Sequence, residues 1–331
     1  MLLKGRIGRY GKTSILSLRS QRVNLTTVRK PLTKTVIPID ESSNTLRHLQ
    51  FTPRMSFEDG LAIQEKFVKA QLDIKELQSK IKRRVAEIED QYENASINEN
   101  EQKILDQIMS MKPNPLLLTF EFDPTYTGGK RVKKTITDQQ IQAFENFVPE
   151  VQKNNPKPKF VQVERGGQIT YHGPGQLVAY IILDLKTFKD FPAKCLVAAI
   201  EQSTINALKH TTLNEKGDKL DLDAFVTENT GVWTSTNKKI ASIGIHVRRS
   251  ITSHGVAVNI DTDLSYMKRF EMCGLKDSIP TSIMNENPNA HVSVQQFAIE
   301  YGKQLAKVLG IQTIERMQIM EDDLKNMLEK N

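Results

Sequence analysis

Apolar residues recur at steps of three and four along residues 57–88, a spacing that places them on one face of a helix. Ser56 and Asp59 stand at the start of this pattern as a capping-box-like pair, which predicts that the helix begins there. The later part of the segment is dense in charged residues and extends further than a core requires. We therefore expect one or two long amphipathic helices, with a charged helical insertion at about 75–112 that presents a solvated face.

The rest of the chain alternates between short apolar runs and helical patterns. LLLTFEF at 116–122 ends at Asp123 and Pro124, which predicts a strand followed by a turn. Residues 128–158 begin with two Gly, are rich in Lys and end in KNNPKP, which predicts a flexible loop that encloses a short helix, TDQQIQAFENFV. Further strands are expected at 159–165, 168–171, 177–185, 231–234, 239–247 and 255–260, and further helices at about 194–210, 292–309 and 315–328.

The order of these elements indicates the fold class. Helices interleaved with clusters of strands at hairpin spacing favour an α+β fold, with a mixed or antiparallel sheet flanked by helices. The sequence shows no internal repeat and no nucleotide-binding glycine pattern between a strand and a helix. Charged or polar residues interrupt every apolar run before the roughly 18 to 20 residues that a membrane span requires. We therefore expect no membrane-spanning segment.

The formal charge of +7 is concentrated at the front of the chain. Residues 1–39 carry nine Lys or Arg and no Asp or Glu, so +7 minus +9 leaves −2 for the remainder. A nearly neutral body lacks the basic surface that binding to a nucleic-acid backbone requires. The basic leader, with interspersed Ser, Thr and Leu, has the composition of a mitochondrial transit peptide. A disordered basic tail without a targeting role is the alternative reading.

The chain has only two cysteines, Cys195 and Cys273, and they lie far apart in sequence. The compartment that the leader indicates is reducing, which argues against a structural disulfide. Neither cysteine has a second one nearby, and the six histidines show no HExxH-like spacing, so we expect no metal site. Cys195 stands in an apolar helical pattern and is expected in the core. A catalytic role for the other thiol stays open.

The densest local signal is RGGQITYHGPGQ at 165–176, where five of twelve residues are Gly or Pro. Paired glycines between two strands let the backbone approach a ligand closely and expose N–H groups, and a proline makes the second turn rigid. The residues alone therefore predict either a tight hairpin or a loop that holds a ligand.

This segment resembles the signature of the lipoyl(octanoyl) transferase family. GVWTSTNKKIASIGIHVRRSITSHGVAVNI and FEMCGL resemble two further blocks of the family, in the same order. The resemblance covers roughly residues 45–310 except the loop near 128–158, so 45–310 is expected to be the catalytic domain and 311–331 a C-terminal helix. It implies the fold of biotin and lipoate protein ligases, in which a mixed sheet flanked by helices carries an acyl-binding tunnel.

The resemblance also implies a catalytic pair, Cys273 as the nucleophile and Lys239 as the acid/base. Transfer from a thioester to an amine through an acyl-enzyme suits a thiolate, which attacks a thioester and leaves again. An adjacent ammonium lowers the pKa of a thiol and favours the thiolate. Without the resemblance, Cys273 would be read as a small core residue and Lys239 as a surface charge at a strand end. Lys238 is the candidate for that surface role.

Substrate-binding residues follow from the same resemblance. Each histidine among them could instead be a hydrogen-bonded structural residue. Strict alternation along 239–245 would also point Lys239 and Ser242 to opposite faces, so a bulge or turn is required to bring both to one ligand. The implied binding residues are Arg165, Gly166, Gly167, Gln168, Ile169, Thr170, Tyr171, His172, Ser242, Ile243, Gly244, His254, Gly255, Val256 and Ala257.

The implied activity is transfer of octanoyl from octanoyl-acyl carrier protein to a lysine of lipoyl domains, without a cofactor, in the mitochondrial matrix. The implied acceptors are the lipoyl domains of 2-oxoacid dehydrogenases and the glycine cleavage H protein. An ATP-dependent lipoate or biotin ligase and a non-catalytic acyl-binding module are the alternatives. Two residues depart from the family pattern: Phe122 replaces a usual histidine, and Met272 replaces a common proline before the cysteine.

Overall fold

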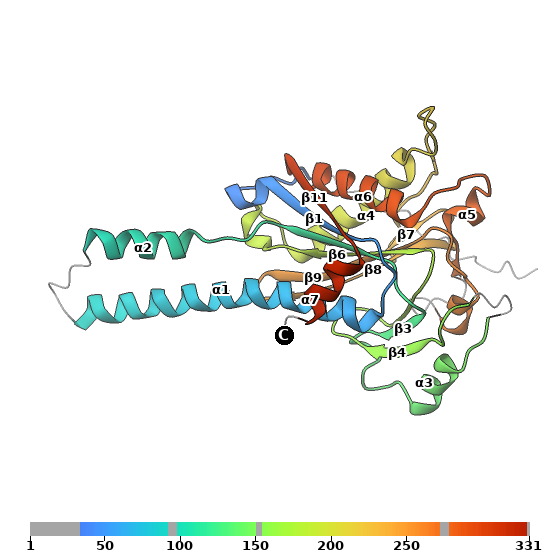
Figure 1. Ribbon diagram of the computed structural model, residues 1–331, viewed down its shortest axis with the longest axis horizontal. Coiled ribbons are helices and arrows are strands. Elements are labelled where there is room, and N and C mark those ends of the chain that lie inside the picture. The colour runs from blue at the N-terminus through green and yellow to red at the C-terminus, as the bar shows by residue number, and fades with distance from the viewer. Residues whose placement is uncertain (1–33, 92–97, 150–153, 272–277, 330–331) are drawn as a thin grey trace, which may run out of the picture.

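A mixed sheet forms the centre of the chain in the computed structural model, which describes residues 34–91, 98–149, 154–271 and 278–329 (Figure 1). Its strands within these residues are β1 (Thr45–Phe51), β2 (Leu116–Phe120), β6 (Gln176–Ile182), β7 (Val232–Trp233), β8 (Lys238–Arg248), β9 (Ile251–Asn259), β10 (Ile279–Pro280) and β11 (Thr313–Ile319). The order is β10-β8-β9-β6-β2-β1-β11, and β7 pairs with β8. Neighbours from β8 to β2 are antiparallel, whereas β1 is parallel to β2 and β11.

Helices cover both faces of this sheet (Figure 1). α4 (Ala193–His210) and α6 (Val294–Val308) pack on one face, and α1 (Phe57–Gln91) crosses the other. Successive side chains of a strand point to opposite faces, so β6 contributes Leu177, Ala179 and Ile181 to the core under α4 and α6. The intervening Val178, Tyr180 and Ile182 pack under α1. Both faces of β6 are therefore buried, and the predicted α+β fold with a mixed, helix-flanked sheet is confirmed.

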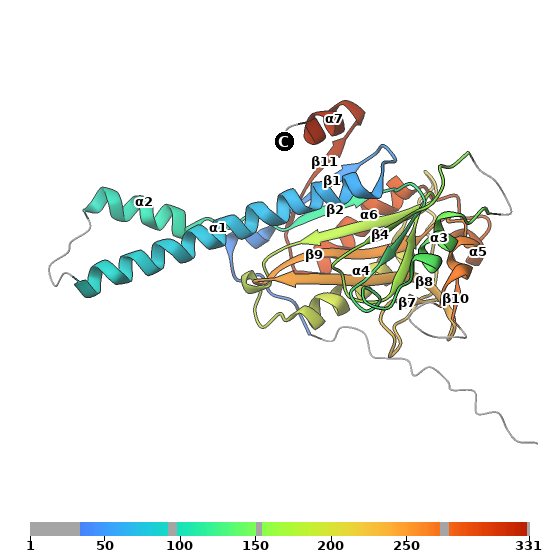
Figure 2. The same cartoon turned by 90° about the horizontal axis from the view of Figure 1, so that it is seen from below.

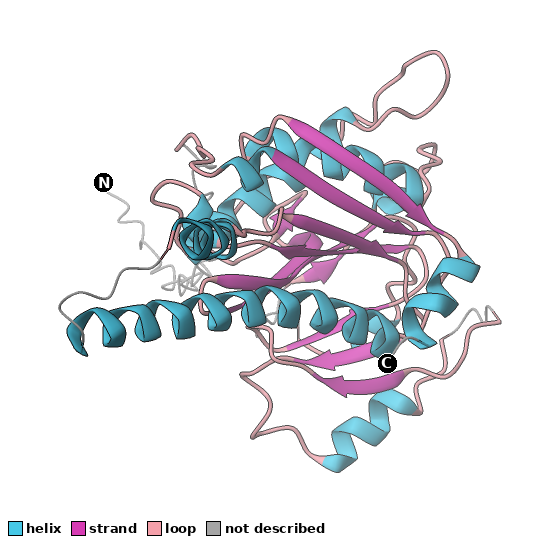
Figure 3. Cartoon of the chain, turned by 60° about the vertical axis from the view of Figure 1, so that its left-hand side comes forward, coloured by secondary structure: helices cyan, strands magenta, loops and turns pink. Residues whose placement is uncertain are grey.

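A second, three-stranded sheet lies on the α1 side of the molecule (Figure 3). It consists of β3 (Thr125–Gly128), β4 (Lys159–Gln162) and β5 (Ile169–His172) in the order β4-β3-β5. α3 (Asp138–Glu145) packs its buried Phe144 against Tyr126 of this sheet, with ring centroids 4.7 Å apart. The short helix predicted inside 128–158 is thus confirmed. The flexibility of that segment stays a prediction, and its residues 150–153 lie outside the described part of the chain.

Two helices occupy most of the described residues of the charged segment 75–112, and its being an insertion stays a prediction. α1 has 35 residues, and α2 (Glu99–Ser110) lies beside its distal half, away from the sheet (Figures 1 and 2). None of the α2 residues is buried, which fits a solvated face. The side chain of Gln78 on α1 donates to the backbone oxygens of Ile108 at 3.0 Å and Met111 at 2.8 Å, and so holds the end of α2 against α1.

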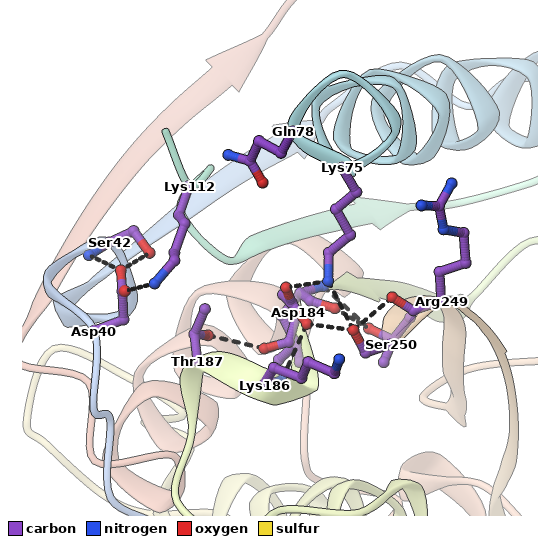
Figure 4. Close-up of polar contacts among 12 residues, drawn as sticks. Asp40, Ser42, Lys75, Gln78, Lys112, Asp184, Lys186, Thr187, Arg249 and Ser250 are labelled. Carbon is purple, nitrogen blue, oxygen red and sulfur yellow. Dashed lines mark hydrogen bonds and ion pairs between the residues drawn. The ribbon is translucent and has the colours of Figure 1, made fainter. Parts of the chain in front are cut away.

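A partly buried ion pair fastens the middle of α1 to the body of the protein (Figure 4). Lys75 Nζ lies 2.5 Å from Asp184 Oδ2 and donates to Ser250 Oγ at 2.8 Å. Ser250 Oγ in turn donates to Asp184 Oδ1 at 2.7 Å. The Lys75 and Asp184 side chains are only 21% and 15% exposed, so solvent screens their attraction less than that of a surface pair.

We predict that Lys75→Met lowers the free energy of unfolding by about 1–2 kcal/mol, because it leaves the Asp184 carboxylate without its cation. The matched control is Lys80→Met on the same helix, where the ion pair with Glu76 is 62% and 52% exposed. Loss of that exposed pair should leave stability nearly unchanged, because solvent screens it. Urea denaturation of both variants gives the comparison. Equal effects in the two variants would show that the Lys75 pair does not anchor the helix.

One predicted helix is wrong in its first half. Residues 313–319 form strand β11, which pairs in parallel with β1 over seven residues, and helix α7 (Glu321–Glu329) begins only afterwards. β11 is the exposed edge of the sheet, with only Ile319 buried, so its side chains carry little apolar alternation. The segment after residue 310 therefore begins as a strand of the same sheet rather than as a helix.

β1 is absent from the predicted elements. Its buried positions include His48 and Gln50, each 1% exposed, and polar residues there hide the alternation that marks a strand. The other predicted strands and helices are present with shifted ends. The remaining short elements are the 3-10 helices η1 (Glu41–Asn44), η2 (Leu185–Thr187) and η3 (Tyr266–Arg269), and the helix α5 (Ile283–Glu286).

Candidate active site

A small cavity lies between the α1 face of the central sheet and the three-stranded sheet. Its volume is about 30 Å³, which is space for one or two water molecules. Nine predicted binding residues line it: Arg165, Thr170, His172, Ser242, Ile243, Gly244, His254, Gly255 and Val256. The lining is completed by Phe57, Val178 and Tyr180. The structure thus brings two blocks of the sequence, 165–172 and 242–256, to one place.

Small residues at matching register positions create the hollow. Ser242 on β8 lies opposite Ala257 on β9, and Gly244 lies opposite Gly255. Residues that pair across strands share a face, so these four form a patch with little side-chain volume. Gly255 also brings β9 close to β6, since a Cβ there would lie 2.2 Å from the backbone oxygen of Ala179. Ala257 itself is buried beneath the cavity rather than in its lining.

His254 reaches the cavity through an unusual backbone conformation. Its φ is +61°, a left-handed value that interrupts the alternation of β9. The ring lies 5.6 Å from that of Tyr180 in an edge-on arrangement, on the α1 side of the sheet. Its backbone N–H donates to Gln64 Oε1 of α1 at 2.6 Å. α1 therefore helps to hold this histidine in place.

Arg165 organises the loop that borders the cavity. Its guanidinium donates to the backbone oxygens of Gly166 at 3.0 Å and Gln168 at 3.0 Å. It also donates to the backbone oxygen and the hydroxyl of Thr127, at 2.9 and 2.7 Å. Gly167 adopts a φ of +93°, and Gly166 N–H donates to the Ile245 oxygen of β8 at 3.1 Å. Of these four predicted binding residues only Arg165 lines the cavity. Gly166, Gly167 and Gln168 belong to the loop that Arg165 holds.

The alternation of β5 divides its four residues between two sites. Thr170 and His172 face the cavity. Ile169 and Tyr171 pack with an aromatic cluster on the other side, where the Tyr171 ring stacks on Tyr266 at 4.5 Å. Those two predicted binding residues are not brought to the cavity.

His172 and His254 are neutral at physiological pH. Burial, together with the positive charge of Arg165, lowers the pKa of each imidazole to about 3. His172 Nδ1 lies 2.9 Å from Gln176 Oε1, whose amide nitrogen donates elsewhere, to Tyr171 O and Asn259 Oδ1. This network assigns the Nδ1–H tautomer, which leaves Nε2 as a hydrogen-bond acceptor. Phe57 stacks on the ring at 5.3 Å and closes that side of the cavity.

Phe122, which stands where the family usually has histidine, is completely buried. Its ring meets Phe57 edge-on at 5.1 Å. Gly60 of α1 makes room for it, because a Cβ at Gly60 would lie 2.4 Å from the Phe122 ring. The replacement therefore supports the aromatic wall from behind rather than adding a polar group to the cavity.

Lys239 lies further along β8 and does not line the cavity. It is 2% exposed, and its Nζ lies 5.3 Å from the centre of the Trp233 ring on β7. The register between β7 and β8 shifts by one residue at Ile240, so β8 has the bulge that the alternation argument required. Cys273 and Met272 lie outside the described residues. Cys195 on α4 was expected in the core, but it is only partly buried and packs against the core cluster from its edge.

Three lining residues were not predicted. Val178 and Tyr180 are indistinguishable in sequence from other core positions of a strand. Phe57 opens the apolar helix pattern, and nothing in its neighbours signals a ligand. In the described part of the chain no cluster of three or more His, Cys, Asp or Glu side chains is placed to bind a metal. Nor does any described helix combine the length and apolarity that crossing a membrane requires.

The resemblance found in the sequence implies that this cavity holds an octanoyl chain. On that expectation we predict that Ser242→Leu fills the cavity and lowers kcat/KM for an octanoyl thioester at least tenfold, because a single methylene already changes specificity in apolar pockets. A butyryl thioester, which needs less space, should lose less. Ser242→Ala, which removes only the hydroxyl, is the control and should retain activity. Steady-state rates with both donors give the test. An equal loss with the two chain lengths would show that the acyl chain does not occupy this cavity.

Comparison with known proteins identifies the family. The model of the lipoyl protein ligase A/B catalytic domain matches residues 90–305. The chain is 62% identical to the mitochondrial octanoyltransferase of Saccharomyces cerevisiae over 297 residues, 89% of this chain and 90% of that protein. It is 55% identical to the mitochondrial octanoyltransferase of Kluyveromyces lactis over 319 residues, 96% of this chain and 94% of that protein. A bipartite lipoate protein ligase from Thermoplasma acidophilum has a similar fold, with a TM-score of 0.53 at 13% identity over 87% of this chain and 93% of that chain.

The fold and the cavity therefore define a catalytic domain of the lipoyl protein ligase A/B class. Within that class the chain belongs to the mitochondrial octanoyltransferase family, because its relatives match almost its whole length. The family, the acyltransferase class and the mitochondrial location expected from the sequence are confirmed. An ATP-dependent ligase is not favoured by these relatives.

Proposed function

We propose that the protein transfers octanoyl from octanoyl-acyl carrier protein to a lysine of lipoyl domains through a thioester on Cys273. The observation that carries this proposal is the cavity itself, where the signature residues of the octanoyltransferase family surround a patch of small residues on an otherwise packed sheet. In the proposed complex the acyl chain lies against Ser242, Gly244 and Gly255. The cavity has space for only one or two water molecules, so its walls have to move apart when an eight-carbon chain enters.

The transfer takes two steps. The Cys273 thiolate attacks the carbonyl carbon of the octanoyl thioester, and the carrier leaves as a thiolate that takes up a proton from the Lys239 ammonium, which becomes a neutral amine. The amine of the acceptor lysine then attacks the Cys273 thioester, the amide bond forms, and the bond from carbon to Cys273 sulfur breaks. Lys239 accepts the proton that the amine loses and returns one to the leaving sulfur. As an ammonium beside Cys273 it also favours the attacking thiolate.

The surroundings of Lys239 support this role. A lysine that is 2% exposed is rare in proteins, because burying an ammonium is costly unless it has a specific partner or function. The Trp233 ring supplies a cation–π contact to its Nζ. The neutral His172 and His254 add no positive charge to the cavity, which suits the uncharged chain of a fatty acyl group. The acceptors proposed are lipoyl domains of 2-oxoacid dehydrogenases and the glycine cleavage H protein.

The test is to incubate the protein with octanoyl-acyl carrier protein in the absence of nucleotide and to measure its intact mass. We expect a gain of one octanoyl group that Cys273→Ser abolishes and Cys195→Ser retains. Addition of a lipoyl domain should then move the group to the acceptor as an amide. Failure to form the adduct without ATP would favour a ligase, and an adduct that never leaves would favour an acyl-binding module.

A further inference from the structure

The side chain of Glu201 on α4 is a buried carboxylate that takes no part in the transfer steps proposed above. Glu201 on α4 is 2% exposed, on the side of the sheet opposite α1. A buried carboxylate is unfavourable unless hydrogen bonds or charges compensate for the lost water. Its Oε1 accepts the backbone N–H of Gly231 at 3.1 Å, a buried contact between residues 30 positions apart. Glu201 therefore fixes the end of the loop that leads into β7.

Gly231 borders the amine of Lys239. Its φ is +132°, a value that favours glycine. A Cβ at this position would lie 2.4 Å from Lys239 Cε and 3.0 Å from Lys239 Nζ. It would also lie 2.6 Å from the backbone oxygen of Ala241. The missing side chain of Gly231 thus leaves the space that the end of the Lys239 side chain occupies.

Trp233 bounds the same space and is itself fixed by the loop. Its indole Nε1 donates to the Asn229 oxygen at 3.1 Å, and its backbone exchanges two hydrogen bonds with Phe225, at 2.8 and 3.0 Å. Asn229 is held in turn by the Thr227 hydroxyl, which accepts its N–H at 3.1 Å. The loop from 227 to 233 therefore presents a glycine and an indole to one lysine, and α4 holds the loop through Glu201.

We propose that Glu201 and Gly231 are positioning residues that set the place of the Lys239 amine in the acyl-transfer reaction. This inference rests on the catalytic role proposed for Lys239. Glu201 holds the Gly231 backbone, and Gly231 limits where the Lys239 side chain can lie. Displacement of a catalytic group by about 1 Å can slow a reaction about 100-fold, so small shifts of this loop have large effects on turnover.

The first test compares two glycines with positive φ. Gly231→Ala should lower kcat at least about 100-fold and leave the KM for octanoyl-acyl carrier protein unchanged, because the acyl cavity is built from other residues. Gly217→Ala is the matched control: its φ is +87°, so alanine is strained there too, but a Cβ would meet nothing within 4 Å. It should keep wild-type kcat. A normal kcat in folded Gly231→Ala would overturn the proposal.

The second test uses Glu201, in case Gly231→Ala does not fold. Glu201→Gln keeps an oxygen that can accept the Gly231 N–H, whereas Glu201→Ala removes it. We expect Glu201→Ala to lower kcat at least tenfold and Glu201→Gln to recover most of it, both at unchanged KM. Ser203→Ala, which removes a buried hydroxyl that bonds only to Ala199 O of its own helix, is the control for a polar deletion in α4.

Different results would contradict the proposed octanoyl transfer and the proposed positioning role of Glu201 and Gly231. If the wild-type protein forms no octanoyl adduct, the proposed function is wrong. If the wild type and Gly217→Ala are active and both Glu201→Ala and Gly231→Ala match them, only the positioning role is wrong. A loss of kcat that follows a loss of folded protein, measured by urea denaturation, would mark a purely structural role. Equal activity of Glu201→Ala and Glu201→Gln would rule out the hydrogen bond to Gly231 as the cause.

Discussion

Replacing Lys239 by methionine should reduce octanoyl transfer at least about 1,000-fold while the protein stays folded. General acid–base catalysis by a positioned side chain contributes about 100- to 10,000-fold, and Lys239 is proposed to supply both the proton transfer and the charge beside Cys273. Methionine is a neutral, flexible side chain of similar length, so it can fill the buried space beside Trp233. Steady-state transfer from octanoyl-acyl carrier protein to a lipoyl domain measures the effect.

The neighbouring lysine gives the control for this prediction. Lys238 is exposed, and its Nζ lies 3.2 Å from Oε1 of Glu286, whose side chain is 16% exposed. Lys238→Met therefore removes an ion pair at the same strand end but no buried cation. We expect Lys238→Met to keep wild-type transfer. If both variants lose activity equally, the loss would come from the strand end rather than from the Lys239 amine. If Lys239→Met transfers octanoyl normally, the proposed acid/base is wrong.

The elements that sequence patterns predicted best are those buried on one or both faces. β6 reads as a continuous apolar run because both of its faces are covered, and α4 shows a helical apolar face because the sheet covers it. The prediction for the residues of β11 was wrong for the opposite reason. It is an exposed edge strand, and its pairing with β1 joins residues more than 260 positions apart. No local pattern contains that pairing.

The residues of the site divide in the same way into those that local sequence predicts and those that depend on contacts between distant segments. The resemblance indicated both blocks that meet at the cavity, and local alternation separates Thr170 and His172 from Ile169 and Tyr171 once the strand is known. The contribution of Phe57 could not be predicted, because it depends on where α1 crosses the sheet. The positive φ of His254 is equally hidden, since neither its identity nor its neighbours require a left-handed residue.

A shift from pH 7.5 to pH 5 should lower the free energy of unfolding by several kcal/mol. Burial lowers the pKa of His48 to about 4 and of His172 and His254 to about 3, against about 6.5 in an unfolded chain. Between these values the unfolded chain binds three protons that the folded chain does not, so stability falls as pH falls below 6.5. At pH 5 each histidine accounts for about 2 kcal/mol, and the three for about 6 kcal/mol.

His48→Gln isolates one of these contributions outside the active site. His48 on β1 is 1% exposed, and its Nε2 lies 2.8 Å from Thr119 Oγ1, a hydrogen bond that a glutamine amide can replace. The substitution should lower stability at pH 7.5, but it should reduce the difference between pH 7.5 and pH 5 by about 2 kcal/mol, because glutamine binds no proton. Urea denaturation of wild type and variant at both pH values measures that difference directly. An unchanged difference would mean that His48 is protonated in the folded protein by pH 5, and that burial does not hold it neutral.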